Sequence, residues 1–532
     1  MTEAVRRRSW LLLLLALLMA APVLVVLASW LAGPAPSWAH LASTVLPGYV
    51  GHSLFLALFT GAGTLLIGVG SAWLVTSYRF PGRRILQWTL LLPMACPAYL
   101  IAYTWTGLLA SEGWLQQALP VPLPDVRHAT GAGLMLVLVL YPYVYLLSRA
   151  AFVNQSAIAL EVARTLGAGP WRRFYRVALP LARPAIIAGL ALVLMETLAD
   201  YGTVAYFGVP TLSTGIYRTW FGLGDRLAAA QMAATLLIMM ATLLWVERRA
   251  RAGQRISLEG GRTPASTRLR GWHALLVPLL LALPVVGGFV LPVIQLLYWA
   301  VPRMEQVMAP GYLGLLINSV LIAGLTAAAA LAFGLLLVFA RRLFDDRARQ
   351  LASRVAAFGY AVPGTVLAVG AVMVLGTLDQ GINQLTASIG LGTPGLVFSG
   401  TLFAVVFACT VRFLTIPVQG LEAGMQSLSW HLDEGARSLG MTPVRMLRRI
   451  HLPLLRVPLA TSALLVFVDT LKELPATLVL RPFDTNTLAV RAFELASDER
   501  LADAALPALT ILLAGLVPVL LLTRSMSPKE RD

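Results

Sequence analysis

The sequence predicts an all-α polytopic membrane protein, with about twelve transmembrane helices in two parallel six-helix repeats. Composition is the first observation behind this prediction. Of the 532 residues, 58% are hydrophobic and 12% are charged, whereas soluble domains carry about 25% charged residues. The second observation is that apolar residues gather in runs such as 10–32 and 274–300, which reach the roughly 20 residues needed to cross a bilayer.

The apolar runs define the expected helices in chain order. The first run follows Arg6, Arg7 and Arg8 and is longer than the apolar region of a signal peptide, about 7–15 residues, so we expect it to be a retained helix. The twelve expected spans are 10–32, 50–77, 85–110, 130–148, 184–205, 228–246, 274–300, 313–340, 355–377, 396–418, 457–480 and 503–523.

The arginines predict how these spans are oriented. With the N-terminus inside, cytoplasmic segments collect most of the arginines, for example Arg79, Arg83 and Arg84, while the outer segments 33–49 and 378–395 carry none. Basic residues collect in the cytoplasmic loops of membrane proteins. We therefore expect a multi-pass protein of the bacterial inner membrane with both termini in the cytoplasm, and this rule also explains the net charge of +16 without nucleic-acid binding.

Internal similarity divides the chain into two halves. The segment PGYVGHSL at 47–54 recurs, with a short insertion, as PGYLGLLINSV at 310–320. We expect an N-terminal half at 1–247, a basic cytoplasmic linker at 248–272 rich in Arg, Gly and Ser, and a C-terminal half at 273–532.

One charged loop occurs twice. EVARTLGAGPWRRFYRVALPLAR at 161–183 and EGARSLGMTPVRMLRRIHLPLLR at 434–456 align without a gap, and 12 of 23 positions are identical. Both copies lie on the expected cytoplasmic side. A duplicated loop indicates a duplicated contact, so we expect two equivalent docking sites for a two-fold partner.

The local pattern in each copy predicts two short helices joined at a bend. Gly167 and Gly440 lie where a helix ends in a left-handed cap, and Pro170 and Pro443 suit the first turn of a new helix. The Leu-Pro pairs of the loop are expected to end that second helix.

A salt bridge is expected on the first helix of each copy. Glu161 and Glu434 stand three residues before an arginine, Arg164 and Arg437, which is a pairing distance on a helix.

The spacing Glu-x-Ala-x3-Gly-x9-Val/Ile-x-Leu-Pro in both copies resembles the EAA signature of ABC importer permeases, the loop that docks into the cleft of the ATPase subunit. The chain departs from that signature at Val162 and Gly435, where a second alanine is usual. The resemblance implies docking roles for Glu161, Ala163, Gly167, Leu179, Pro180, Glu434, Ala436, Gly440, Leu452 and Pro453.

The resemblance extends along the whole chain. METLADYGTVAYFG at 195–208 and KELPATLVLRPF at 472–483, in a fused twelve-span layout, are similar to iron(III) permeases that work with ferric-binding periplasmic proteins. Fused thiamine permeases share this layout, so thiamine or another small solute stays open as the cargo. The resemblance implies a non-enzymatic permease without a cofactor, with an ABC ATPase homodimer, a periplasmic binding protein and membrane lipid as partners.

Some chemistry is missing from the sequence. No Gly-Lys pair occurs, so the chain has no phosphate-binding P-loop and ATP must be hydrolysed by another chain. Cys96 and Cys409 lie far apart in apolar runs and are expected to be small core residues, and the scattered histidines indicate no metal site.

Acidic residues recur at matching places in the fifth span of each half, where charges are costly and usually face an interior or an aqueous path. Two readings stay open: the acids line a cation pathway, or they pair with Lys472 and local arginines to hold the spans together. The tentative pathway set is Glu196, Asp200, Tyr201, Asp469, Lys472 and Glu473, and no metal ligands are assigned.

Two other functional classes share some of these sequence features or could occur in a membrane protein. A secondary transporter also suits twelve spans in two parallel halves, but it does not need the repeated loop. A membrane-embedded enzyme is disfavoured because the sequence has no His-rich motif or acid pair at a catalytic spacing.

Overall fold

The computed structural model describes residues 3–118, 124–154, 162–251, 267–343, 359 and 362–526. The chain forms two compact units. Unit 1 comprises Met1–Trp38, Ile216–Ala234 and Gln306–Arg491, and unit 2 comprises Ala39–Gly215, Thr235–Glu305 and Ala492–Asp532.

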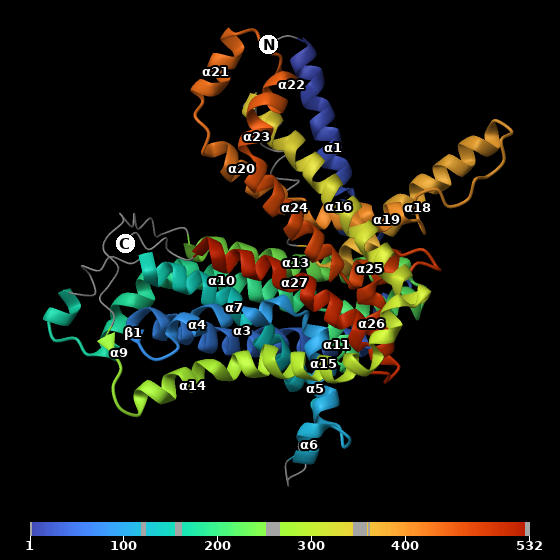
Figure 1. The fold of residues 1–532 in the computed structure, drawn as a ribbon. Coiled ribbons are helices and arrows are strands. Elements are labelled where there is room, and N and C mark those ends of the chain that lie inside the picture. The colour runs from blue at the N-terminus through green and yellow to red at the C-terminus, as the bar shows by residue number, and fades with distance from the viewer. Residues whose placement is uncertain are drawn as a thin grey trace. The chain divides into compact units, whose positions relative to one another are not determined.

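The described elements are almost entirely helical (Figure 1). The helices up to the middle of the chain are α1 (Glu3–Ala28), α2 (Trp38–Thr44), α3 (Leu46–Ser77), α4 (Arg83–Thr89), α5 (Ala98–Leu109), α6 (Trp114–Ala118), α7 (Ala129–Asn154), α9 (Pro170–Arg173), α10 (Leu179–Ala199), α11 (Gly202–Tyr206), α12 (Leu212–Phe221) and α13 (Arg226–Arg251). The later helices are α14 (His273–Val285), α15 (Leu291–Ala300), α16 (Pro310–Leu343), α18 (Gly364–Ser388), α19 (Leu402–Phe413), α20 (Thr415–Gln426), α21 (His431–Ser438), α22 (Pro443–Met446), α23 (Leu452–Leu454), α24 (Arg456–Leu471), α25 (Pro475–Leu480), α26 (Leu488–Ser497) and α27 (Ala505–Met526).

Shorter elements complete the described part of the chain. The 3-10 segments are η1 (Ser29–Ala32), η2 (Leu92–Ala95) and η5 (Val301–Met308), and the π-helical segments are η3 (Phe174–Ala178), η4 (Val286–Val290) and η7 (Leu447–His451). Strands β1 (Tyr78–Arg79) and β2 (Thr267–Arg268) pair in parallel, with Tyr78 opposite Thr267 and Arg79 opposite Arg268.

The prediction of an all-α membrane protein is confirmed. Eight described helices are long and apolar enough to cross a bilayer, or up to eleven if each of three bent helix pairs is one span. The bent pairs are Arg83–Ala95 with Ala98–Leu109, Leu402–Phe413 with Thr415–Gln426, and Pro443–Leu454 with Arg456–Leu471. The last predicted span corresponds to a shorter apolar helix, Ala505–Leu521, and Cys96 and Cys409 are buried as expected.

The compact units differ from the two halves of the sequence. In unit 1, α1 packs against α18, and the Gly370 backbone on α18 lies against the Pro22 carbonyl group on α1. In unit 2, α15 packs against α5 and α27, with the Trp299 ring stacked on Tyr103 at 6.4 Å between centroids. Each unit therefore contains the first helix of one half packed among helices of the other.

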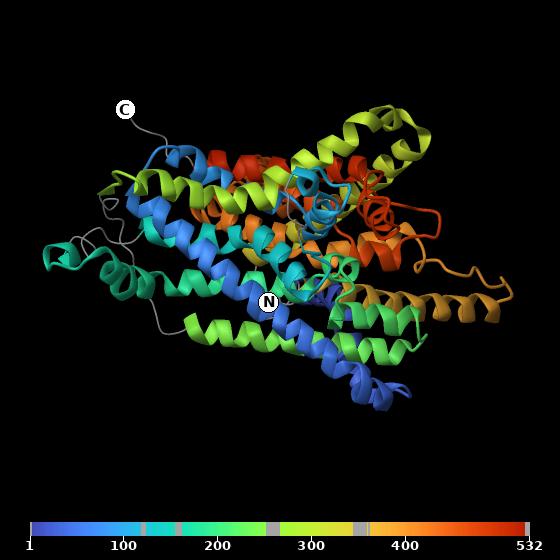
Figure 2. The ribbon, with the colours of Figure 1, turned by 90° about the horizontal axis from the view of Figure 1, so that it is seen from below.

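Helices α3, α7 and α10 pack against one another in unit 2, and α3 is the long blue helix that crosses the view in Figure 2. Gly68 on α3 allows close contact, since an added Cβ would lie 2.8 Å from the Val144 Cβ on α7. In unit 1, α16 packs against α20 in the same way, because a Cβ on Gly334 would lie 3.1 Å from the Pro417 Cβ. Small residues let membrane helices approach each other closely.

Serines at matching places in the two halves support the start of a later helix. In unit 2, the Leu212 N–H donates to the Ser53 Oγ at 3.0 Å, and in unit 1 the Leu488 N–H donates to the Ser319 Oγ at 2.8 Å. Both serines lie in the repeated segments at 47–54 and 310–320 that the sequence analysis aligned. The first turn of a helix has N–H groups without intrahelical partners, so each serine satisfies one of them.

Replacing Gly68 with valine is expected to lower the free energy of unfolding by about 1–3 kcal/mol, the usual cost of overpacking. The added side chain would meet Val144 and the Tyr141 carbonyl oxygen, which lies 3.0 Å from the Cβ position. Thermal unfolding of the purified protein in detergent measures the effect. Gly324→Val on α16 is the control, because nothing lies within 4 Å of a Cβ at that position. Equal unfolding temperatures for the two variants would contradict the packing argument.

Candidate functional site

The repeated loop forms the same backbone corner in both copies. Gly167 has a φ of +77° and Gly440 a φ of +70°, so both glycines adopt the predicted left-handed conformation. In the first copy the Ala168 N–H donates to the Ala163 carbonyl oxygen at 2.9 Å, and in the second the equivalent bond, from Met441 to Ala436, is 3.0 Å. Each of these hydrogen bonds closes a turn of six residues around a left-handed glycine. This pattern is a Schellman cap, and it ends the first helix at the equivalent position in each copy.

A second helix starts directly after each corner. Pro170 and Pro443 occupy its first turn, as predicted, and in the second copy the Thr442 hydroxyl also accepts a hydrogen bond from the Arg445 N–H. Both second helices then pass through a π-helical turn, Phe174–Ala178 in one copy and Leu447–His451 in the other.

The expectation that the Leu-Pro pairs end the second helix is wrong for the first copy. Pro170–Ala199 is one continuous span through Leu179 and Pro180. A proline lacks the N–H that bonds to the preceding turn, and the π turn before Pro180 changes that hydrogen-bond pattern, so the helix continues. In the second copy the helix ends at Leu454, and the chain bends by 77° into α24.

The other predicted docking residues lie around these corners. Glu161 is outside the described residues. Ala436 is buried and Ala163 is half-buried, whereas Glu434, both corner glycines and both motif prolines are exposed, and Leu179 and Leu452 are half-buried. The alanine side of the first helix therefore packs on the protein, and the corner projects outward.

Large apolar side chains beside the corners were missed by the sequence analysis. Leu166 is 81% exposed and Leu439 is 79% exposed, and these leucines occupy equivalent positions directly before the corner glycines. Trp171 in the first copy is 72% exposed, and Val444 in the second is 58% exposed. The two leucines could have been found from the sequence, because a leucine precedes the corner glycine in both copies. Exposed apolar patches commonly mark protein interaction sites.

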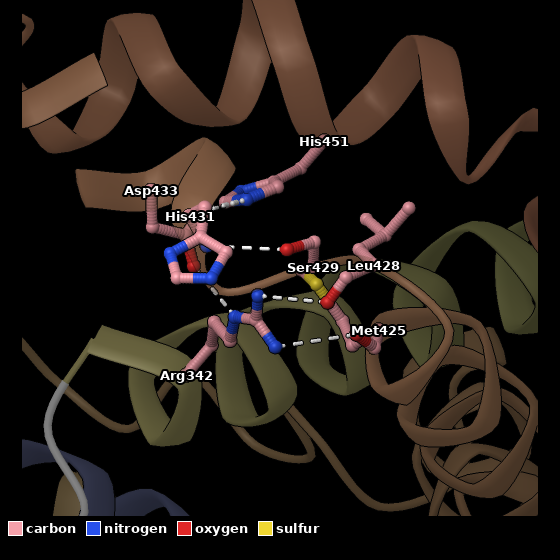
Figure 3. A network of polar contacts seen from close by, with 7 residues as sticks. All are labelled: Arg342, Met425, Leu428, Ser429, His431, Asp433 and His451. Carbon is pink, nitrogen blue, oxygen red and sulfur yellow. Dashed lines mark hydrogen bonds and ion pairs between the residues drawn. The ribbon is translucent and has the colours of Figure 1, made fainter. Parts of the chain in front are cut away.

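The second copy is anchored by a buried polar network within unit 1 (Figure 3). Asp433 on α21 lies between two partners: its Oδ1 is 2.7 Å from His451 Nε2, and its Oδ2 accepts from Arg342 Nε at 2.6 Å. The side chains of Asp433 and His451 are each 1% exposed, and that of Arg342 is 14% exposed. The network joins α21, the π turn before α23 and the end of α16.

Arg342 also holds the segment that leads into α21. Its guanidinium donates to the carbonyl oxygens of Met425, at 3.3 Å, and Leu428, at 3.1 Å (Figure 3). The same guanidinium lies over the Trp430 ring, 4.8 Å from its centroid. A planar guanidinium can bond a carboxylate and stack on an aromatic face at once, and lysine cannot replace both contacts.

The two copies differ in this anchor. The residues that align with Asp433 and His451 in the first copy are Leu160, which lies outside the described residues, and Ala178. Neither can form the ion pair. The corners therefore share a backbone geometry, but a carboxylate–imidazole–guanidinium network is possible only at the C-terminal one.

The expected pairing of Glu434 with Arg437 is also replaced by other contacts. Glu434 Oε2 lies 3.2 Å from His431 Nδ1, and the Arg437 guanidinium lies 5.7 Å from the centroid of the Trp430 ring. Trp430 thus lies between two arginines, Arg437 and Arg342, and its stacking takes Arg437 away from the carboxylate.

The membrane-embedded acids have local structural partners. Asp200 accepts from the Thr203 hydroxyl at 3.0 Å and the Val204 N–H at 3.1 Å, at the start of α11. Glu473, at the matching place in unit 1, accepts from the Ala476 N–H at 2.9 Å, at the start of α25. Both acids therefore cap a short helix that follows the fifth span of a half.

The basic residues around these acids occur in unit 1. Glu473 Oε1 lies 2.9 Å from Arg412 Nη1, and Asp469 Oδ1 lies 2.8 Å from Lys472 Nζ. Arg412 was missed as a specific partner, although an arginine inside an apolar run was a visible signal. The residues that align with Arg412 and Lys472 in the first half are Val139 and Ala199.

The remaining predicted pathway residues lie beside this site. Tyr201 is buried in unit 2, with its ring 6.0 Å from that of Phe493, and Glu196 lies close enough to Asp200 for the two carboxylates to interact electrostatically. Within the described residues, no group of three or more His, Cys, Asp or Glu side chains is placed to hold a metal ion.

Comparison with known proteins places these features in one family. The profile of the binding-protein-dependent transport system inner membrane component matches residues 64–248 and again residues 330–531. The chain belongs to this family, which makes it a multi-pass inner-membrane permease of the ABC type rather than an enzyme.

Individual relatives include permeases named for iron. The chain is 25% identical, over 89% of its length and 89% of the relative's, to the Fe(3+)-transport system permease protein FbpB 2 of Haemophilus influenzae. It is 22% identical, over 82% of its length and 65% of the relative's, to the ferric transport system permease protein FbpB of Actinobacillus pleuropneumoniae. A shorter match, 28% identical over 36% of this chain and 90% of the relative, is to the molybdenum transport system permease protein ModB of Escherichia coli.

Replacing Asp433 with asparagine is expected to destabilise the C-terminal loop by about 3–5 kcal/mol, because it leaves the Arg342 charge without its buried partner. Limited proteolysis of 427–456, followed by mass spectrometry, measures the local effect. Glu434→Gln removes an exposed ion pair one residue away and should cost at most about 1 kcal/mol. The network would have no anchoring role if both variants were cleaved at the wild-type rate.

Proposed function

We propose that this chain is the membrane subunit of an ATP-driven importer and forms the route for iron(III) delivered by a periplasmic binding protein. ATP is hydrolysed by two copies of a separate ATPase subunit, one at each repeated loop. The observation that carries the coupling role is the duplicated glycine corner with its exposed leucine.

The shape of the corners supports docking into a partner. Each is a helix end with a left-handed glycine, and neither Gly167 nor Gly440 has any atom within 4 Å of an added Cβ. Leu166 and Leu439 project beside them into open space. A buried apolar residue at the centre of an interface commonly supplies much of the binding energy. The sequence contains no P-loop of its own, which is consistent with a separate source of ATP hydrolysis.

The iron assignment is supported by the extent of the similarity. Relatives named for Fe(3+) or ferric transport match over 82% to 89% of this chain, whereas relatives named for sulfate or molybdenum match over 29% to 36%. Acidic side chains in the fifth spans also suit a cation better than an oxyanion. A hard cation such as iron(III) favours oxygen ligands.

The acids of the fifth spans can cap helices and still influence a permeant ion. The Asp200 carboxylate accepts a hydrogen bond at the N-terminus of α11, and Asp200 is half-buried. The positions that align with the basic residues Arg412 and Lys472 are occupied in this half by Val139 and Ala199. Glu473 is neutralised by Arg412 within unit 1. We therefore place the stronger electrostatic role in the pathway on Asp200 and Glu196, and a structural role on Glu473.

The orientation follows from the arginines. Both corners lie in arginine-rich segments, which supports a cytoplasmic location for them, for the termini and for the linker at 248–272. Docking of a cytoplasmic ATPase requires this orientation.

Replacing Gly167 and Gly440 together with valine is expected to weaken ATPase binding by about tenfold or more, because a left-handed non-glycine residue costs about 1–3 kcal/mol. Binding of the purified cognate ATPase to membrane vesicles measures the effect. Gly169→Val is the matched control, since its φ of −63° suits any residue. The docking proposal is refuted if the double variant binds as well as the control, and the orientation is refuted if right-side-out vesicles bind while inside-out vesicles do not.

Replacing Asp200 with asparagine is expected to lower iron accumulation by about tenfold, equivalent to about 1.4 kcal/mol. Asparagine keeps one oxygen that can accept from the Val204 N–H, and its amide NH2 can donate to the Thr203 hydroxyl in place of the second carboxylate oxygen, so the protein should still insert and bind its ATPase. Uptake of radioactive iron in cells that also express the binding protein and ATPase measures the effect. Asp225→Asn is the control, because Asp225 also caps a helix, accepting from the Ala228 N–H at 2.9 Å.

Two results would distinguish the pathway role of Asp200 from the assignment of iron as the cargo. Normal iron uptake by the Asp200 variant would remove this residue from the pathway. Uptake of molybdate or thiamine, but not iron, by the wild-type system would overturn the cargo and leave the permease class intact.

A further inference from the structure

Helix α16 is fixed by polar side chains at both of its ends, and both attachments lie within unit 1. It is one unbroken helix from Pro310 to Leu343 (Figure 1). Ser319 and Arg342 lie about 35 Å apart along it, at about 1.5 Å per helical residue, whereas the hydrocarbon core of a bilayer is roughly 30 Å thick. The two attachments are therefore far enough apart to lie on opposite sides of the membrane.

At one end, Arg342 connects α16 to the C-terminal corner (Figure 3). Its Nε donates to the Asp433 carboxylate on α21 at 2.6 Å, and the same guanidinium donates to the carbonyl oxygens that precede α21. The Asp433 side chain is almost fully buried, so water does not readily replace this pair. A displacement of α21 must therefore either move α16 or break a buried ion pair, which is costly.

At the other end, two neighbouring side chains of α16 hold the start of α26. The Ser319 hydroxyl accepts from the Leu488 N–H at 2.8 Å and donates to the Leu315 carbonyl oxygen, also at 2.8 Å. The Asn318 side-chain amide donates to the Asn486 carbonyl oxygen at 3.2 Å. The start of α26 is therefore bonded to α16 at two points.

The segment held at this end follows the fifth span of its half. Residues 481–487 join α25 to α26, and Arg481 ties them together by donating to the Thr485 carbonyl oxygen and the Asn486 side-chain oxygen. Glu473, one of the acids considered for the cation pathway, caps the start of α25. A shift of α16 would therefore reach the segment between the two short helices that follow the acids.

Helix α3 is the counterpart of α16 in unit 2 but is attached differently. Ser53 on α3 aligns with Ser319 and makes the same kind of bond, accepting from the Leu212 N–H at 3.0 Å. Thr76 aligns with Arg342 at the same offset, and its hydroxyl donates to carbonyl oxygens within α3 itself. Helix α3 therefore shares the serine link but carries an uncharged residue in place of the arginine.

We propose that α16 transmits movement between the C-terminal corner and segment 481–488, with Arg342 and Ser319 as positioning residues at its two ends. Packed protein interiors have low compressibility, so a helix held at both ends passes a displacement on. The inference deepens the proposed function and rests on it only in naming the ATPase as the partner that moves the corner. In transport, movement of the ATPase at α21 repositions the segment between α25 and α26 at the opposite end of α16.

The test is hydrogen–deuterium exchange with mass spectrometry on the purified full-length protein in mild detergent, without ATPase or cargo. Arg342→Lys keeps a charge for Asp433 but loses the planar fork that also reaches the carbonyl oxygens. It should speed exchange in 481–490 by about fivefold, the low end of the usual coupling between two sites. Arg341→Lys is the matched control, because the neighbouring Arg341 forms a partly exposed pair with Glu422, and it should leave 481–490 at the wild-type rate.

The reverse direction is tested from the other end of α16. Ser319→Ala removes the acceptor for the Leu488 N–H and should speed exchange in 427–440, because coupling between two sites is reciprocal. Ser53→Ala removes the same kind of bond from α3 and should leave 427–440 unchanged. In the double variant Arg342→Lys with Ser319→Ala, exchange in 481–490 should be no faster than in Ser319→Ala alone, since α16 is already released there. Independent effects at sites this far apart would instead add.

Three results would overturn the transmission. The first is that each variant changes exchange only at its own end of α16, and the second is that the two effects add in the double variant. The third is an equal rise in 372–388 of α18, a helix of the same unit, because that rise would indicate general loosening of unit 1.

A second measurement separates this inference from the proposed function. Adding the purified cognate ATPase with a non-hydrolysable ATP analogue should slow exchange in 481–490 of wild type but not of Arg342→Lys. If the ATPase does not bind, the proposed function fails, while the coupling between the ends of α16, measured without ATPase, stands. If the ATPase binds and leaves 481–490 unchanged, the role of α16 in transport is refuted.

Discussion

The structure depends on one constraint: within a bilayer, each backbone N–H and C=O must find a partner inside the protein. Continuous helices meet this requirement by themselves, but the breaks do not. Side chains supply the missing partners at several breaks. Asp379 in α18 accepts from the N–H groups of Val397, Phe398 and Ser399, and Gln231 in α13 accepts from the Ala35 N–H while donating to the Gly33 carbonyl oxygen.

This constraint changes how polar residues in the spans are interpreted. Asp200 and Glu473 lie where the fifth span of each half gives way to a short helix, and both accept from that helix's backbone. A charged residue in a membrane helix is often taken as functional by default. In this structure both acids cap a short helix, and any role that they have in ion movement must be compatible with that capping. Asp200 can combine helix capping with a role in ion movement more readily than Glu473, because the charge of Glu473 is also paired with Arg412.

The two glycine corners, at Gly167 and Gly440, share the same backbone geometry but are attached to the rest of the protein in different ways. A Schellman cap and a following π turn recur in both, so each presents a leucine and a glycine in the same way. The C-terminal corner is joined to α16 through Arg342 and Asp433, and the N-terminal one passes as a continuous helix into its span at Pro170–Ala199. If the proposed ATPase binds both corners, its movement would reach the membrane through a side-chain network at one corner and through a continuous helix at the other.

The sequence alone determined the class, the spans and the corners. Apolar runs predict membrane helices because length and hydrophobicity suffice for that inference, and a glycine before a helix-starting proline predicts a left-handed cap from local geometry. The duplicated loop also predicted both left-handed corners, since Gly167 and Gly440 repeat at a fixed offset.

Only the tertiary structure decided which side chains meet. The contact of Asp433 with Arg342 spans 91 residues, and that of Glu473 with Arg412 joins the break between α24 and α25 to α19, so neither follows from periodicity. Both copies have a π turn before their Leu-Pro pair, yet the helix continues through Pro180 in the first copy and ends at Leu454 in the second, a difference that the sequence did not indicate. Local sequence patterns predict helices and turns. Contacts between distant helices depend on how those helices pack, and no periodic pattern in a single sequence predicts them.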